Sequence, residues 1–271
     1  MTAPIALTIA GSDSSGGAGI QADLKTFSAL GVYGASVITA LTAQNTKGVR
    51  AILDAEPGFI ADQIDAVFED LDVRAVKIGM LSRPAVIEAV AVALQRYGAR
   101  QIVLDPVMVA KSGDALLQPE AVASLRDRLL PLATLITPNL PETAVLLDAP
   151  APADTDAMIA AAESLLRLGP RAVLVKGGHL DGSDSVDVFH DGDAPRRFAA
   201  RRVTTENTHG TGCTLSSAIA AHLALGKPLD ESVAAAKDYL TGAIAAADRL
   251  GVGGGRGPVH HFHRLWDRGL G

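Results

Sequence analysis

Short apolar runs alternate along this chain with longer amphipathic segments. Ile5–Ala10 and residues 101–104 and 172–175 are such runs, each too short for a stable helix and rich in aliphatic residues. Between runs of this kind lie segments with helical apolar spacing, such as residues 84–97. Buried strands that alternate with helices form a parallel sheet covered on both faces. The sequence therefore predicts an α/β fold around a central, mostly parallel sheet.

The remaining elements follow from the same patterns. Further strands are expected at residues 36–43, 75–78 and 135–136, with a hairpin formed by 186–189 and 197–203. Further helices are expected at residues 20–30, 59–71, 155–168, 212–225 and 229–250, with a shorter one opened by Pro141 and Glu142. We find no repeat of fixed period and no long linker, so we expect one domain over residues 1–271.

Charge and cysteine content narrow the class of protein. The net charge of −6 and the isoelectric point near 5.6 argue against nucleic acid as a partner. A single cysteine cannot form an internal disulfide, which favours a reducing cytoplasm. Ile5–Ala10 is read as a first strand and not as part of a signal peptide, and no apolar run approaches the roughly 20 residues of a membrane helix. We expect a cytoplasmic protein without a membrane or nucleic-acid partner.

Residues 207–217 place two glycines, Gly210 and Gly212, where a loop becomes a helix. Free backbone N–H groups and the positive end of the helix dipole make such a position an anion site. Cys213 lies at the helix start, where its thiol pKa should fall, so that a thiolate could accept a proton from a substrate hydroxyl. The alternative is that Cys213 is a small buried apolar residue. We expect a phosphate site with Cys213 at its edge.

Polar residues follow the ends of most expected strands. With the glycines and the methionine beside them, these strand-end residues are Gly11, Asp13, Gln44, Gly79, Met80, Asp105, Asn139, Glu142 and Lys176. Ligands of open α/β sheets bind beyond the carboxyl ends of the strands, so all of these residues could line one cleft. Asp105, Asn139 and Glu142 supply the oxygen ligands that suit Mg²⁺. They are also consistent with a turn at Asp105 and with helix capping at Asn139, and the two interpretations can hold together.

Three single residues have two interpretations each. Lys176 ends a buried strand and could hold phosphate, or it could be an edge lysine that reaches water. Gln44 offers donors and an acceptor that match the edge of a heterocycle, and Asp23 could bind a ligand amine or hydroxyl, but either side chain could simply be solvated. His260, His261 and His263 lack the spacing of common zinc motifs and are interpreted as packing residues.

The first glycine-rich loop, residues 11–19, matches neither the dinucleotide-binding nor the P-loop spacing. Together with residues 42–46, 77–81, 105–113, 137–142, 176–179 and 207–217, however, the stretch 10–26 resembles the ribokinase-like superfamily. Within it, the chain looks like the bacterial hydroxymethylpyrimidine/phosphomethylpyrimidine kinases of the thiamine pathway. The resemblance runs from residue 5 to residue 262. It implies a three-layer α/β/α sandwich and, from what relatives suggest, a homodimer.

The resemblance also implies an activity and a role for each matching residue. ATP, with Mg²⁺, would phosphorylate 4-amino-5-hydroxymethyl-2-methylpyrimidine first to the monophosphate and then to the diphosphate. The implied pyrimidine contacts are Gln44, Gly11, Asp23, Met80 and Val107. The implied metal residues are Asp105 and Glu142, the implied ATP-phosphate residues are Lys176 and Asn139, and the implied anion hole with its base is Gly210, Thr211, Gly212 and Cys213.

Three other functions stay open at this point. A pyridoxal or pyridoxine kinase would share the fold and a similar heteroaromatic alcohol. A sugar kinase is less favoured, because many sugar kinases of this superfamily carry Asp where this chain has Cys213. A pyrimidine-binding module without catalysis is the third, although the anion loop, Lys176 and the acidic residues are all present.

Overall fold

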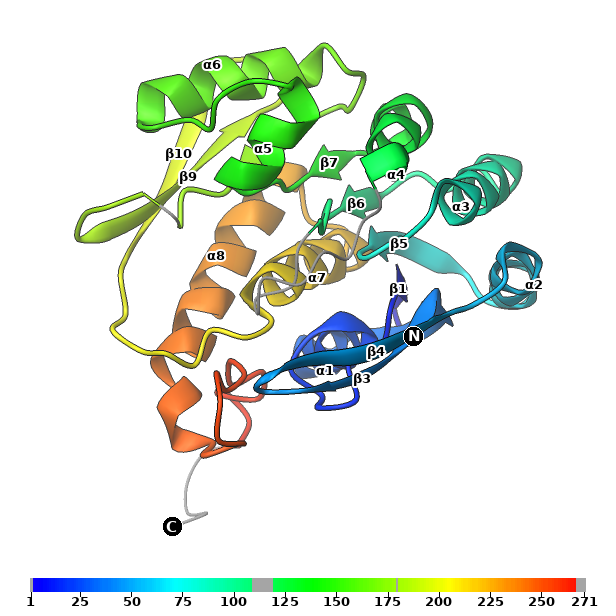
Figure 1. The fold of residues 1–271 in the computed structure, drawn as a ribbon, viewed down its shortest axis with the longest axis horizontal. Coiled ribbons are helices and arrows are strands. Elements are labelled where there is room, and N and C mark those ends of the chain that lie inside the picture. Colours follow the sequence, from blue (N-terminus) through cyan, green and yellow to red (C-terminus); the bar gives the residue numbers. More distant parts are fainter. Residues whose placement is uncertain (1, 109–118, 179, 267–271) are drawn as a thin grey trace.

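An eight-stranded sheet forms the centre of the computed structural model, which describes residues 2–108, 119–178 and 180–266 (Figure 1). Its strands are β1 (Ile5–Ala10), β2 (Tyr33–Ile38), β5 (Val73–Ile78), β6 (Ile102–Leu104), β7 (Leu135–Ile136), β8 (Val173–Val175), β9 (Asp184–His190) and β10 (Arg196–Arg201). They are ordered β2-β1-β5-β6-β7-β8-β9-β10. Only β9 runs antiparallel to its neighbours, so the expected mostly parallel sheet and the expected β9–β10 hairpin are confirmed.

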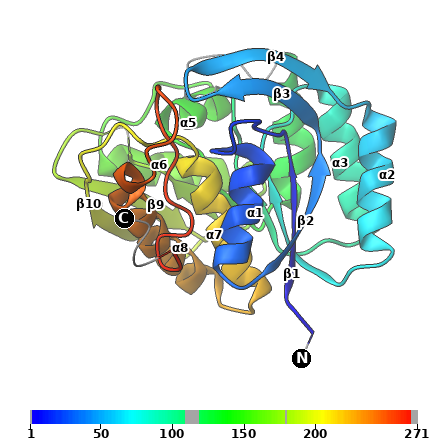
Figure 2. The same ribbon diagram turned by 90° about the horizontal axis from the view of Figure 1, so that it is seen from below.

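Helices cover both faces of this sheet, as Figures 1 and 2 show. One face carries α2 (Pro57–Phe68), α3 (Pro84–Arg96), α4 (Pro119–Ser124), α5 (Leu140–Leu147) and α6 (Thr155–Leu166). The other carries α1 (Gly19–Ala29), α7 (Thr211–Ala224) and α8 (Leu229–Ala245). Short helical turns extend α4 (Leu125–Leu129 and Leu130–Leu132) and α8 (Ala247–Arg249). The arrangement is the three-layer α/β/α sandwich.

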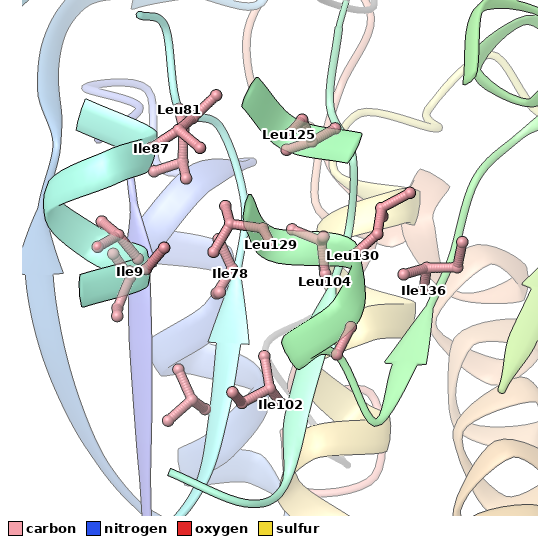
Figure 3. Packing of buried hydrophobic residues seen from close by; sticks show 14 of the residues in the cluster. Ile9, Ile78, Leu81, Ile87, Ile102, Leu104, Leu125, Leu129, Leu130 and Ile136 are labelled. Carbon is pink, nitrogen blue, oxygen red and sulfur yellow. The ribbon is translucent and has the colours of Figure 1, made fainter. Parts of the chain in front are cut away.

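Alternating side chains of the strands fill two separate cores. In β6, Ile102 and Leu104 point to the α2–α6 side and Val103 points to the α7–α8 side. Because both faces are buried at the centre of the sheet, strands β6, β7 and β8 are apolar at every position instead of alternating with polar residues. Figure 3 shows part of the first core, to which Ile78 of the sheet and Leu129 of the segment after α4 both belong.

The prediction of one strand over residues 36–43 is wrong, because the strand is interrupted at Thr39, between β2 and β3 (Ala40–Asn45). There the backbone N–H donates to Ala10 O at 3.0 Å and the hydroxyl donates to Met80 O at 2.9 Å, which ties Thr39 to the ends of two main-sheet strands. The next strand, β3 (Ala40–Asn45), leaves the sheet and pairs with the unexpected β4 (Gly48–Asp54). Figure 2 shows this hairpin standing outside the main sheet, at the carboxyl end of β1.

The chain order of the strands creates a switch point between β1 and β5. From β1 the chain first moves outward to β2, and the later strands are added from β5 in the other direction. Crossovers on the two sides of such a point diverge and leave a crevice beyond the carboxyl ends of the strands. Gly11 and Gly79 directly follow β1 and β5, at this crevice.

Candidate active site

Backbone hydrogen bonds continue the sheet one step beyond the strands and align the polar residues there. Asp105 N donates to Ile78 O at 2.9 Å, and Lys176 N donates to Pro138 O at 2.8 Å. The second bond belongs to a short parallel bridge between Asn139 and Lys176. Residues that are distant in sequence therefore project from one edge of the sheet, as the strand-end pattern predicts.

Lys176 lies between two carboxylates. Its Nζ is 2.7 Å from Asp105 Oδ1 and 3.9 Å from Glu142 Oε2, and the Lys176 side chain is 14% exposed. Thr137 Oγ1 also donates to Asp105 Oδ1, at 3.0 Å. Burial alone would lower the pKa of Lys176, but the two carboxylates outweigh it and raise the pKa, so the ammonium stays charged. The edge-lysine interpretation is wrong, because β8 lies inside the sheet between β7 and β9.

Asn139 and Glu142 cap α5. The Asn139 side chain accepts from Glu142 N at 2.9 Å, and the Glu142 carboxylate accepts from Asn139 N at 2.7 Å. This capping box confirms one of the two interpretations of these residues. Burial raises the pKa of Glu142 to about 7, with a further contribution from Asp105, although Lys176 opposes the shift.

The start of α7 lies against this charged cluster. Gly210 is the N-cap with φ of +81°, and a Cβ there would collide with Gly17 O, so the position requires glycine. A Cβ at Gly212 would lie 3.3 Å from Asp105 Oδ2 and 3.5 Å from Lys176 Nζ. No side chain caps the helix. The first turn of α7, with Thr211 at its start, thus lies close to the Lys176 ammonium.

Cys213 lies in the same first turn and is partly exposed. Burial raises the pKa of its thiol to about 11; Lys77 and the Gly19 N–H act against this shift, whereas Asp23 adds to it. The expectation of a lowered thiol pKa at this helix terminus is wrong, since the loss of hydration exceeds the favourable charges. At neutral pH Cys213 carries its proton.

Asp23 belongs to a polar network without exposed surface beneath this turn. It pairs with Lys77 Nζ at 2.8 Å, and it accepts from Thr8 Oγ1 and Ser217 Oγ, each at 2.6 Å. Both sequence interpretations of Asp23, direct ligand contact and a solvated surface position, are therefore wrong, because its oxygens are occupied by buried donors. Lys77 was not among the predicted site residues; its only signal in the sequence is a lysine inside a buried strand.

Beyond β1, Gly11 and Met80 are neighbours: a Cβ on Gly11 would lie 2.6 Å from Met80 Cε. Val107 follows two residues after Asp105, and its N–H donates to Asp105 O at 2.8 Å. Gln44 is partly exposed on β3 and lines a cavity of about 410 Å³. The cavity is also lined by Asn45, Thr46, Lys47, Gly48, His209, Gly255 and Arg256.

The structure adds His209, which the sequence analysis did not single out although it stands in the loop before α7. Its Nε2 is 2.8 Å from Asp13 Oδ2. By contrast, the histidines near the end of the chain are packing residues, as expected: His260 and His261 are buried, and His261 contacts Thr214 Oγ1 at 3.2 Å. Among the described residues, no group of three or more His, Cys, Asp or Glu side chains could hold a metal ion.

None of the helices within residues 2–108, 119–178 and 180–266 is both long and apolar enough to cross a membrane.

The chain matches one family of known proteins over most of its length. The family model described as phosphomethylpyrimidine kinase matches residues 13–260. A hydroxymethylpyrimidine/phosphomethylpyrimidine kinase of Rhizobium meliloti is 63% identical over 98% of this chain and 99% of its own. The enzyme of the same name from Escherichia coli is 58% identical over 96% and 98%.

Solved structures give the same result at the level of the fold. A phosphomethylpyrimidine kinase from Clostridium difficile is 51% identical, with a TM-score of 0.79 over 89% of this chain and 99% of its own. A pyridoxal kinase from Bacillus subtilis, solved as an ADP complex, is 38% identical, with a TM-score of 0.91 over 98% and 100%. The pyridoxal kinase thus shares the fold at a lower identity. The chain belongs to the hydroxymethylpyrimidine/phosphomethylpyrimidine kinase family.

Proposed function

We propose that this protein transfers the γ-phosphoryl group of ATP to the hydroxymethyl oxygen of 4-amino-5-hydroxymethyl-2-methylpyrimidine, and then a second one to the resulting phosphate. The observation that carries the proposal is the closeness of the first turn of α7 to Lys176, since a Cβ added to Gly212 would lie 3.5 Å from the ammonium nitrogen. ATP as the donor is supported by related pyridoxal kinases solved with ADP and with AMP-PCP.

Phosphoryl transfer relies on positioning and on stabilisation of charge. The backbone of Gly210, Thr211 and Gly212 would face the moving phosphoryl group with N–H groups, and Lys176 would supply a fixed positive charge. Because Asp105 and the bridge to Asn139 hold Lys176 in place, little reorganisation is needed during the reaction. Asn139 would lie near the ATP phosphates as well, because the bridge holds it beside Lys176.

Asp105 and Glu142 would hold Mg²⁺. Mg²⁺ is commonly bound by one or two carboxylates, with waters and substrate phosphates completing its shell, and two carboxylates beside one ammonium fit that pattern. The ion would neutralise charge on the ATP phosphates. The carboxyl of Glu142 must be ionised to contribute, which its pKa of about 7 permits at neutral and higher pH.

The pyrimidine would bind between Gln44, Gly11, Met80 and Val107, with Cys213 at the acceptor hydroxyl. The thiol pKa of about 11 makes Cys213 a poor resident base, so we assign it a positioning contact with the acceptor oxygen. Phosphoryl transfer with a loose transition state needs no early proton removal. Asp23 would not contact the substrate; it would support the start of α7 from below, through its buried pair with Lys77 and its bond to Ser217.

Steady-state kinetics with ATP and Mg²⁺ test the substrate assignment. The pyrimidine alcohol should show a higher kcat/KM than pyridoxal, the substrate suggested by the pyridoxal kinases with this fold. A higher kcat/KM for pyridoxal would reverse the assignment. Tight pyrimidine binding without turnover would identify a binding module.

Three broader proposals follow from the same family. One domain over residues 1–271 is supported by the single sheet that both cores share. A cytoplasmic location is supported by the single free cysteine. A homodimer is supported by the outer hairpin, where the paired Leu41 and Leu53 are 50% and 68% exposed. Sedimentation equilibrium would test the last by giving the mass in solution.

A further inference from the structure

Three neighbouring strands each place one polar side chain just beyond their carboxyl ends. Asp105 follows β6, Thr137 follows β7 and Lys176 follows β8. Thr137 stands in the middle of this row, and its backbone N–H donates to Leu104 O at 3.0 Å. Thr137 is 0% exposed and Asp105 is 1% exposed. The Thr137 hydroxyl is therefore buried among the charged residues of the candidate site.

The Thr137 hydroxyl and the Lys176 ammonium donate to the same oxygen of Asp105. Thr137 Oγ1 is 3.0 Å from Asp105 Oδ1, and Lys176 Nζ is 2.7 Å from it. Burial alone would raise the pKa of Asp105, but the charges of Lys176 and Lys77 outweigh it and lower the pKa. Asp105 is therefore ionised and only accepts hydrogen bonds, so Oδ1 receives the Thr137 proton.

The other oxygen of Asp105, Oδ2, faces the first turn of α7. A Cβ built on Gly212 would lie 3.3 Å from it. Among the described residues, its hydrogen-bond contact is with Ser216 Oγ, at 3.4 Å. That hydroxyl has one proton and lies closer to Gly212 O, at 3.0 Å, so its contact with Oδ2 is weak. Oδ2 therefore keeps the capacity to bind a ligand on the α7 side.

An anionic oxygen at this place suits a cation. The first turn of α7 is where the phosphoryl group would bind, and a carboxylate oxygen that faced this group directly would repel it through like charge. A divalent cation between the two groups is attracted to both, and Mg²⁺ prefers carboxylate and phosphate oxygens. The Lys176 ammonium does not fill this role at Oδ2, because it is bonded to Oδ1.

The two donors to Oδ1 differ in how firmly they hold the carboxylate. The Thr137 hydroxyl is carried by a β-branched side chain, whose rotation is restricted, and its backbone is tied to the neighbouring strand. The Lys176 ammonium stands on a flexible four-carbon stem and can follow the carboxylate if it rotates. Thr137 is therefore the fixed partner that keeps Oδ1 and Oδ2 from exchanging places.

We propose that Thr137 is a positioning residue for phosphoryl transfer: it occupies Asp105 Oδ1 together with Lys176 and so presents Oδ2 to a divalent cation beside the first turn of α7. This inference rests on the proposed role of Asp105 in holding Mg²⁺. It assigns to Thr137 no contact with the substrate or with the cation.

Mn²⁺ binding to the full chain, measured by EPR without nucleotide, tests the proposal independently of activity. Thr137→Val nearly keeps the shape of the side chain and removes the hydroxyl, so the dissociation constant of Mn²⁺ should rise about tenfold. Thr137→Ser returns a hydroxyl to the same place and should recover most of the affinity. An unchanged dissociation constant in Thr137→Val would overturn the proposal.

Thr143→Val is the matched control. Thr143 is also buried and lies next to Glu142, but its hydroxyl has no partner among the described residues. This variant should bind Mn²⁺ as the wild type does, and a loss equal to that of Thr137→Val would contradict the proposal. If urea unfolding shows that Thr137→Val does not fold, Thr137→Ala removes the same hydroxyl and carries the same expectation.

Steady-state kinetics separate positioning from general damage to the cleft. At saturating ATP, Thr137→Val should raise the Mg²⁺ concentration for half-maximal rate about tenfold. KM for the pyrimidine alcohol should stay unchanged, because Thr137 acts through Asp105 alone. Equal changes in both quantities would count against the proposal.

The same measurements distinguish failure of the underlying assignments. Asp105→Asn should weaken Mn²⁺ binding more than Thr137→Val does. An unchanged affinity in Asp105→Asn would remove Asp105, and with it Thr137, from cation binding while leaving the kinase proposal intact. Absence of Mn²⁺ binding by the wild-type protein would contradict the metal assignment and this inference, and absence of turnover would contradict the kinase proposal itself.

Discussion

At the scale of single residues, the buried pair of Lys77 and Asp23 shows how the site is supported from below. Both side chains have no exposed surface, and Ser217, one turn after Cys213 on α7, bonds to Asp23. The Asp23 charge holds the pKa of Lys77 above its ordinary value although burial opposes this. The pair therefore anchors the first turns of α7 to the sheet.

Asp23→Asn should destabilise the protein by about 3–5 kcal/mol, because it leaves the Lys77 ammonium buried without its counter-charge. Urea unfolding measures this. Asp238→Asn is the matched control, since it breaks an exposed pair with Arg264 and should change stability by at most about 1 kcal/mol. The double variant Asp23→Asn, Lys77→Met should be more stable than Asp23→Asn; lower stability would contradict the pairing argument.

Gly212→Ala should lower kcat by about 10²–10³-fold while changing stability little, because the added methyl group occupies space beside Asp105 and Lys176 where a phosphoryl oxygen would bind. Gly58→Ala is the control, as it lies in the first turn of α2 with open space around it. Initial rates and urea unfolding of both variants check this. Retention of full activity in Gly212→Ala would contradict the placement of the phosphoryl group.

Cys213→Ala should reduce both phosphorylation steps by a similar factor. The thiol is protonated at neutral pH, so it can position the acceptor but does not act as a resident base. Rates measured separately with the alcohol and with its monophosphate decide this. A loss confined to the alcohol would restore the base role, because only the first acceptor has a hydroxyl proton to lose.

At the scale of elements, periodicity identified the buried strands and most helices, and it failed where elements are exposed. Most residues of β4, including Arg50, are exposed, so no apolar alternation marked this strand. The segment from α4 onward did carry a signal that we overlooked: Ala121, Leu125 and Leu129 are spaced by four and are all buried. The break at Thr39 depends on bonds to distant strands, which a local pattern does not contain.

Helix α7 carries a buried histidine that should make stability depend on pH. Burial lowers the pKa of His222 to about 4, with Lys227 and Arg264 contributing, and its Nδ1 has no partner. Between pH 4 and the unfolded value of about 6.5, the unfolded chain binds more protons, so stability falls as pH falls.

The pH effect is measured by urea unfolding at pH 7 and pH 5. The stability lost between these two conditions should be about 2 kcal/mol smaller in His222→Leu than in wild type, from about 1.4 kcal/mol per pH unit. Other titrating groups, such as His261, contribute to both proteins and cancel in the difference. The same loss in both proteins would contradict the role of His222.

At the scale of the whole molecule, the sheet order explains why the strand-end residues could be predicted as one site. Parallel strands end at one edge, so Asp105, Glu142 and Lys176 had to lie close together once the fold class was known. The pattern could not show which side chains are buried beneath the cleft. Asp23 was misplaced and His209 was missed because their environments are made by segments far apart in the chain.

We propose that one cleft phosphorylates an aminopyrimidine alcohol twice. A phosphorus NMR time course of the wild-type protein with ATP, Mg²⁺ and the pyrimidine alcohol measures both transfers. We expect the monophosphate signal to rise first and then give way to the diphosphate, with ADP equal to the phosphoryl groups transferred. ADP formation without either pyrimidine phosphate, or a monophosphate that is never converted, would contradict it.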